Sequence, residues 1–257
     1  AISASDKEAV TESVASAGIV AISVGKNAVL KIVPHIAGGL IKRFENSSDS
    51  QALDIIIAEN MRSAGAYVHK QLQQYLPDNF PVDEFVGLVD TSIGKMVPLM
   101  TESDLSKDPL LLHAEPYNTL ILDKNGFRGK IPDIAGLMPK KNIRAWIDRK
   151  AFIHNLGHAS AAYFGAFRHP GATYVHEILK DAKVYRFARE VMLQSAKILL
   201  KYYPEDFTLE DLLEHIDDLL LRFQNTALKD TIYRIGMDLP RKLAPSDRFV
   251  GIIRMAQ

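Results

Sequence analysis

The first half of the chain alternates two hydrophobic patterns, one typical of buried strands and one of amphipathic helices. Continuous apolar runs at residues 18–25, 53–60 and 84–90 predict three buried strands, and residues 110–124 predict two more. Helical spacing of apolar positions appears at residues 3–18, 27–44 and 60–76, with Pro34 and the Gly38-Gly39 pair expected to bend or interrupt the second helix. The polar residues 45–50 predict a loop. Strands that alternate with helices favour a parallel sheet with crossover helices.

From about residue 142 onward the pattern changes to one helix after another. Residues 146–165, 184–203 and 212–223 keep helical spacing, and the last helix follows a capping-box pattern at Thr208 and Asp211. Phe187, Val191 and Leu199 are core candidates of the middle helix. The Gly- and Pro-rich residues 125–141 separate the two parts. We therefore predict an α/β domain at residues 1–140 followed by an all-α domain at residues 141–257.

Charge and composition exclude several classes of partner. The 31 basic residues balance 31 acidic residues, so general binding to nucleic acid or to a membrane surface is not expected. The chain has no cysteine, which excludes disulfides and thiolate chemistry and agrees with a reducing cytoplasm. No apolar run is long enough to span a bilayer, and the first residues lack the pattern of a signal peptide. A cytoplasmic protein is the expectation.

The sequence HNLGH at residues 154–158 carries the candidate chemistry. On an α-helix, Lys150, His154, His158 and Asn155 lie at about 0°, 40°, 80° and 140°, on one polar face. Two histidines four residues apart resemble the zinc ligands of H-E-x-x-H, but Asn155 stands where that motif has its glutamate, and no third ligand follows.

Two other interpretations of this face need no metal. The histidines can be ordinary polar residues of a solvated or core-satisfied helix. Alternatively, burial can lower the pKa of Lys150 until the amine works as a general base, while Asn155 and His158 donate hydrogen bonds to an oxygen that gains negative charge. Spacing alone leaves all three interpretations open.

K-x4-N-x2-H within DRKAFIHNLGHASAAYFG closely resembles the signature helix of the polyol-specific long-chain dehydrogenases. The blocks GIVAISVGKNAVLKIVPHIAGGLIKRF, IIIAENM, FVGLVDTSIGKMVP, FRGKIPDIAGL, RFQNTALKDTIYRIG and RKLAPSDR are similar to that family as well, in order along nearly the whole chain. The resemblance is closest to the branch that acts on mannitol 1-phosphate. It implies a metal-free oxidoreductase that uses NAD to interconvert mannitol 1-phosphate and fructose 6-phosphate, with a small polyol phosphate as partner.

The resemblance also assigns roles to particular residues. Lys150 matches the family's general acid/base, and Asn155, His158 and Asn60 match residues that bind and polarise the reacting oxygen. The segment Ser23, Val24 and Gly25 matches the strand-end loop along the cofactor, and Glu59 ends the neighbouring strand, so these four residues are the expected cofactor site.

A phosphate site is predicted from charge. Arg241, Lys242 and Arg248 form the clearest cationic cluster, for which surface salt bridging is the alternative. Asn225 and Lys229 match a family block and are expected at the edge of the site.

Two departures from the family pattern stand out. No GxGxxG turn occurs, and Gly94-Lys95 replaces an acidic–basic pair. The resemblance thus predicts the C-terminal part of a Rossmann-type domain followed by an incomplete helical domain, in a fragment with an unpaired sheet edge that favours self-association. The full-length protein is expected to be a monomer. Mannitol 2-dehydrogenase, hexuronate reductase and a non-catalytic, substrate-binding fragment remain alternatives.

Overall fold

The computed structural model describes residues 2–46 and 51–257, and the chain folds into two compact units. The first unit comprises residues 1–93 and 119–143, and the second comprises residues 94–118 and 144–257. The predicted loop at 45–50 falls mostly outside the described residues. Among the helices that the structure describes, none is both long enough and apolar enough to cross a membrane.

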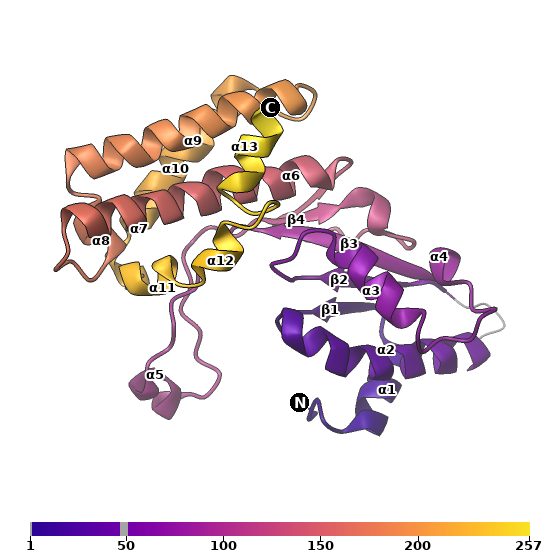
Figure 1. Cartoon of the computed structure of the whole chain (residues 1–257). Helices are drawn as coiled ribbons and strands as arrows, with labels where there is room; N and C mark the ends of the chain where they lie inside the picture. Colours follow the sequence, from indigo (N-terminus) through magenta and orange to yellow (C-terminus); the bar gives the residue numbers. More distant parts are fainter. Residues whose placement is uncertain (1, 47–50) are drawn as a thin grey trace. The chain divides into compact units, whose positions relative to one another are not determined.

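The first unit is built on a five-stranded sheet in the order β1-β2-β3-β4-β5 (Figure 1). Its strands are β1 (Ile19–Ile22), β2 (Leu53–Ile57), β3 (Val86–Ile93), β4 (Leu120–Asp123) and β5 (Leu137–Lys140). The pairs β1–β2 and β2–β3 are parallel, which confirms the predicted parallel sheet. The predicted strand at residues 110–116 is wrong, and β4 pairs antiparallel to β3. All five residues of β2 are buried, whereas β1, at an edge of the sheet, is partly exposed.

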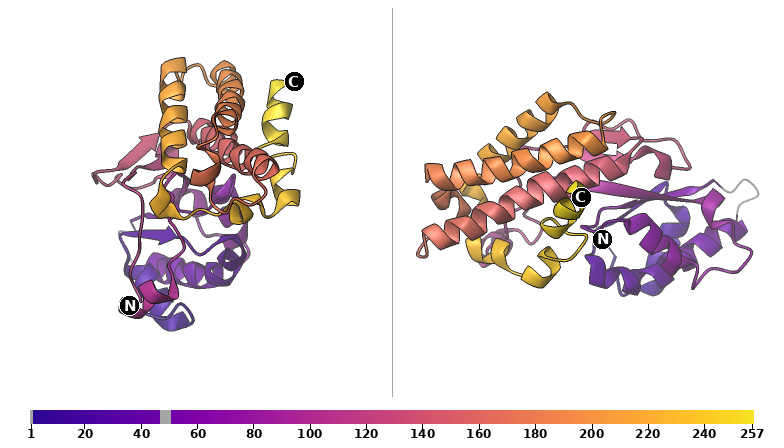
Figure 2. Two further views of the ribbon diagram at one scale, coloured as in Figure 1. Left: turned by 90° about the vertical axis from the view of Figure 1, so that its left-hand side faces the viewer. Right: turned by 45° about the horizontal axis from the view of Figure 1, so that its top comes forward.

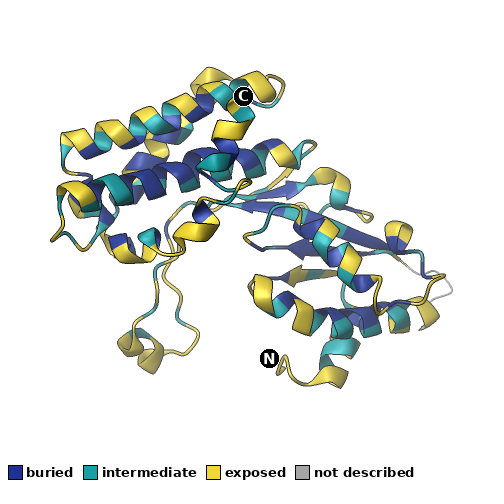
Figure 3. Ribbon diagram, in the orientation of Figure 1, coloured by how far each residue is buried: buried dark blue, intermediate teal, exposed yellow. Residues whose placement is uncertain are grey.

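Helices cover this sheet and close its core. They are α1 (Lys7–Ser16), α2 (Lys26–Asn46), α3 (Ala64–Leu72) and α4 (Val82–Phe85), and the 3-10 turn η1 (Lys124–Gly126) follows β4. Helix α2 continues through Pro34 and is not interrupted. A Cβ atom at Gly39 would collide with Val14, so this glycine lets α1 pack closely on α2. Figure 3 shows the buried residues concentrated on the strands and on the helix faces turned to them.

The second unit is a bundle of helices around one apolar core. Helix α6 (Ile143–Arg149), the π-helical segment η2 (Lys150–Asn155) and α7 (Leu156–Arg168) follow one another directly. The remaining helical elements are α5 (Glu102–Lys107), α8 (Val175–Ile178), α9 (Ala182–Tyr202), α10 (Leu209–Phe223), η3 (Thr226–Leu228), α11 (Ile232–Gly236), α12 (Leu239–Lys242) and α13 (Val250–Ala256). Helices α7, α9 and α10 lie side by side in every view (Figures 1 and 2).

The helical predictions for this unit agree with the structure in their main points. Thr208 and Asp211 form the predicted capping box, in which each backbone N–H donates to the side chain of the other residue. Leu199 is fully buried, but Phe187 is 41 % exposed and is therefore not a core residue. A Cβ atom at Gly157 would collide with Met192, so α7 and α9 approach closely at this point.

Candidate functional site

The segment that carries Lys150 and Asn155 is π-helical, where the sequence predicts a regular α-helix. Hydrogen bonds in a π-helix join residues five apart instead of four, which widens the turn. Residues 150 and 155 consequently lie on the same side of the helix, and both are partly buried. Such segments are rare and occur frequently at functional sites.

Side chains from distant elements bond to backbone carbonyl groups of the π-helical segment. The Ser195 hydroxyl, from α9, donates to the Phe152 carbonyl at 2.5 Å in a buried bond. Arg248, just before α13, donates from Nη1 to the Asn155 carbonyl at 3.4 Å. The segment is therefore held in place by tertiary contacts.

His154 does not share the polar face predicted for it. Its side chain is buried, at 6 % exposure, and its ring lies 5.6 Å from that of Phe223. Burial, with His158 and Lys150 nearby, holds the pKa of His154 well below its usual range, so the imidazole is neutral. Among the residues that the structure describes, no three His, Asp or Glu side chains are grouped so that they could hold a metal ion. The third ligand that the zinc interpretation of HNLGH requires is thus not found there.

Lys150 has the environment of a general base. Burial, and secondarily the positive charge of Arg248, lowers the pKa of Lys150 to about 8. An amine with this pKa exchanges a proton readily near neutral pH, which an ordinary exposed lysine does not. Lys150 is only partly buried.

His158 is held by a carboxylate that the sequence did not single out. Its Nε2 atom lies 2.9 Å from Oδ2 of Asp230, and its ring stacks on Phe223 at 4.6 Å. Asp230 is only 8 % exposed and also accepts a hydrogen bond of 2.9 Å from Nε of Arg234. Burial alone would raise the pKa of Asp230, but the bonds to His158 and Arg234 outweigh it and lower that pKa. Asp230 therefore remains a carboxylate.

The predicted cationic cluster is arranged around a second carboxylate that the sequence analysis missed, Asp247. Arg248 donates to Asp247 at 2.8 Å, and Nη1 of Arg241 lies 3.3 Å from its other oxygen. Lys242 is buried and donates to the carbonyl groups of Ile235 and Met237. Of the three cations, Lys242 is thus committed to the backbone, whereas half-exposed Arg241 can also face a ligand.

In the first unit, the expected cofactor residues meet at the carboxyl ends of β1 and β2. One oxygen of the buried Glu59 carboxylate accepts hydrogen bonds from the N–H groups of Val24 at 2.7 Å and Gly25 at 2.9 Å. Gly25 has a φ of 81°, a left-handed conformation that suits glycine. Ser23 lies on the same turn, and Asn60 directly follows Glu59. These backbone groups therefore already have an anionic partner, supplied by the chain itself.

The second unit holds residues 94–118 through a buried ion pair. Arg222 bonds to Glu115 at 2.5 Å and to the Gly94 carbonyl at 2.6 Å. Lys95, the departure from the family pattern, donates to the Tyr117 carbonyl at 2.7 Å and so has a structural partner. A cavity of about 490 Å³ lies beside this ion pair, and Asn225 and Lys229 are among the residues that line it.

Two family models match the chain. The model of the mannitol dehydrogenase Rossmann domain matches residues 1–136, and that of the mannitol dehydrogenase C-terminal domain matches residues 142–257. These matches confirm the predicted order of a Rossmann-type sheet followed by a helical domain.

Two solved structures are similar in fold. The crystal structure of a D-sorbitol dehydrogenase in substrate-free form has a TM-score of 0.80 at 18 % identity, covering 98 % of this chain and 58 % of that one. The Pseudomonas fluorescens mannitol 2-dehydrogenase ternary complex with NAD and D-mannitol has a TM-score of 0.63 at 17 % identity, covering 89 % and 53 %. The chain thus spans less than two thirds of either relative.

Proposed function

The chain belongs to the mannitol dehydrogenase family, and from this membership we propose that it serves NAD-dependent oxidation of a sugar alcohol and reduction of the matching ketose. The observation that carries the proposal is the lowered pKa of Lys150, about 8, on the π-helical segment beside Asn155. This combination offers a base and an amide donor to one hydroxyl group.

Each residue then has a chemical task. In the oxidation direction, bound NAD would supply the acceptor for the hydride that leaves the carbinol carbon. Uncharged Lys150 takes the hydroxyl proton, and the amide of Asn155 steadies the oxygen as its negative charge grows, with a contribution of about 3 kcal/mol. Asn60 lies in the first unit, and the supporting role that the family resemblance implies for it stays a prediction. Because an amine with a pKa of about 8 can accept the proton directly, the proposed reaction uses no metal ion.

The chain supplies part of a cofactor site. Ser23 and Val24 directly follow β1 and are exposed, so they could lie along NAD at the edge where ligands of parallel sheets bind. The N–H groups of Val24 and Gly25 are bound to Glu59. We therefore expect the turn to guide the nucleoside part of the cofactor, not to bind the pyrophosphate.

We further propose that the substrate is phosphorylated, as in mannitol-1-phosphate 5-dehydrogenase, with fructose 6-phosphate as the ketose. Arg241 and Arg248 share Asp247, and Arg248 reaches the backbone of Asn155, which brings a guanidinium next to the reacting end of the site. A guanidinium pair suits a phosphate because it donates paired hydrogen bonds. The alternatives within the family are mannitol 2-dehydrogenase and hexuronate reductase, which act on substrates without phosphate.

The test compares NADH formation from mannitol 1-phosphate, from free mannitol and from a hexonate, the product of a hexuronate reductase. We expect turnover with the phosphate, and an Arg241→Ala variant, which removes the half-exposed cation of the cluster, should lose affinity for the phosphate about tenfold, the effect of one charge-assisted hydrogen bond. Arg254 is exposed on α13, so Arg254→Ala provides the matched control and should bind the phosphate as wild type does. Turnover of free mannitol but not of mannitol 1-phosphate would support the dehydrogenase role and contradict the proposed phosphorylated substrate.

A further inference from the structure

Asp230 stands out because the chain binds it from several directions. Its carboxylate contacts the imidazole of His158 and the guanidinium of Arg234. Its carbonyl accepts a hydrogen bond of 3.0 Å from the N–H of Val175, where Tyr174 and Thr231 form an isolated β-bridge. The position of this carboxylate is thus fixed by both its side chain and its backbone.

The contact decides which nitrogen of His158 carries a hydrogen. A carboxylate accepts hydrogen bonds and cannot donate them, so Nε2 must bear the hydrogen that it shares with Asp230. In the neutral ring, Nδ1 is then unprotonated and can only accept. The ring is also held flat on Phe223, with 19° between the two planes, so rotation of the imidazole would break both contacts.

We propose that Asp230 is a positioning residue that fixes His158 in the Nε2–H form, so that Nδ1 accepts a hydrogen bond from a hydroxyl group of the polyol. This inference rests on the proposed function and deepens it. In this proposal Asn155 donates to the reacting oxygen and Lys150 moves the proton. His158 accepts a hydrogen bond from a substrate hydroxyl, and this replaces the donor role at the reacting oxygen that the family resemblance implies for it. A substrate that lacks a hydroxyl at that position would lose this bond.

The direct test is nitrogen NMR of the full 257-residue chain with labelled histidine, in which His158 is assigned by its loss in His158→Gln. We expect a protonated Nε2 and an unprotonated Nδ1 for His158 at neutral pH. In Asp230→Asn, the side-chain oxygen should keep the hydrogen bond from Arg234, which leaves the amide N–H facing the ring of His158. Because that N–H donates, Nε2 must accept, and the hydrogen of the ring should move to Nδ1. Two results in the wild-type chain would overturn the proposal, even if no variant of Asp230 folds: an Nε2 without hydrogen, or hydrogen on both ring nitrogens.

A matched control lies on the same stretch of chain. His169 directly follows α7, the helix that carries His158, and contacts Asp181 through Nε2 at 2.8 Å. Asp181→Asn should change the signals of His169 and leave those of His158 as they are. If Asp181→Asn changed the signals of both histidines, the change at His158 would reflect the structure as a whole, and this would contradict a specific role of Asp230.

Kinetics separate positioning from folding. If the proposed function holds, Asp230→Asn should raise KM for the polyol about tenfold, the effect of one hydrogen bond to substrate, while KM for NAD stays the same. Asp230→Glu, which keeps the carboxylate, should recover part of the affinity. Equal changes in both KM values would contradict the inference. Because the NMR measurement needs no turnover, an inactive protein would count against the proposed function without deciding the state of His158.

Discussion

Two clusters of the same composition lie near the two ends of α7, and they differ in burial. His158, Asp230 and Arg234 form the first, in which the histidine side chain is 16 % exposed. His169, Asp181 and Arg168 form the second, in which it is 41 % exposed. The histidine–carboxylate distances are nearly equal, at 2.9 and 2.8 Å. Identical chemistry thus occurs in two environments.

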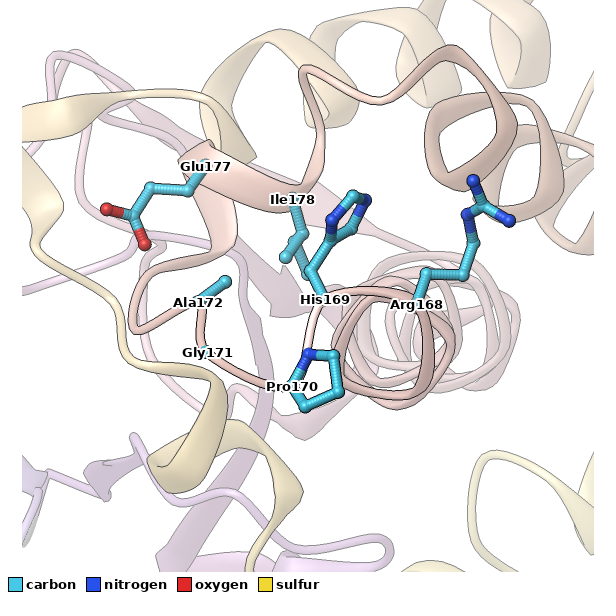
Figure 4. A pocket seen from close by; sticks show the side chains of 7 residues that line it. All are labelled: Arg168, His169, Pro170, Gly171, Ala172, Glu177 and Ile178. Atoms are coloured by element: carbon cyan, nitrogen blue, oxygen red, sulfur yellow. The ribbon is translucent and has the colours of Figure 1, made fainter.

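The environment determines what each cluster can do. In the first cluster, His158 stacks on Phe223 and lies three residues beyond the π-helical segment that carries Lys150. In the second, Arg168 and His169 line an open pocket of about 470 Å³ with Glu177 and Ile178 (Figure 4). Water competes for every hydrogen bond at an exposed site and screens its charges, so such pairs contribute little. The comparison teaches that a histidine–aspartate pair becomes informative about function when burial fixes it beside a reactive group.

The largest effect is expected at Lys150, the proposed base. Replacing Lys150 with methionine, which keeps the length of the side chain, should lower kcat about a thousandfold because general base catalysis is lost. Lys197→Met on the exposed face of α9 is the matched control and should behave as wild type. Steady-state NADH formation measures both. A Lys150→Met variant that keeps most of its kcat would remove this residue from the chemistry.

The next effect separates the two histidines. His158→Ala should lower kcat/KM about a hundredfold, since the proposed contact with a substrate hydroxyl is lost. His169→Ala should leave kcat/KM unchanged. Losses of similar size in the two variants would mean that burial does not distinguish the clusters as we describe.

The smallest expected effect is on the stability of the fold, which unfolding in urea measures. Asp230→Asn should lower the free energy of unfolding by about 2 kcal/mol, because a buried ion pair loses its anion. Asp181→Asn should cost less. Bonds to Lys183, Arg168 and His169 lower the pKa of Asp181, so its stabilisation is present above the pKa of an unfolded aspartate and fades as the pH falls through the folded pKa. A greater loss for Asp181→Asn at neutral pH would reverse the ranking.

Sequence patterns predicted the parts of the fold that depend on local order. The strand β2 and the helices α9 and α10 follow from continuous or helically spaced apolar residues. Residues 110–116 misled the strand prediction because an apolar run alone does not say whether a neighbouring strand exists to pair with it. Phe187 was assigned to the core from its spacing, although it lies at the border of the buried face.

In the candidate site too, a local motif identified some residues, whereas contacts from distant parts of the chain could not be predicted. Lys150, Asn155 and His158 were identified from a motif within one helix, but the π-helical turn depends on Ser195 and Arg248, which bond to it from elsewhere in the chain. Asp230 could not be found because a single aspartate in ALKDTIY has no pattern of its own, and its partner precedes it by a long stretch of sequence. The roles assigned to the site residues therefore stay predictions.

The pH dependence of polyol oxidation tests the central claim, that Lys150 is the base, most directly. The uncharged amine is the active form, so kcat/KM should rise with pH through an apparent pKa of about 8 and level off above it. Arg248 and neutral His154 lie near Lys150. Wild-type protein is compared with Lys150→Met. A rise near pH 8 that is absent from the variant would support the account, and the same rise in both proteins would contradict it.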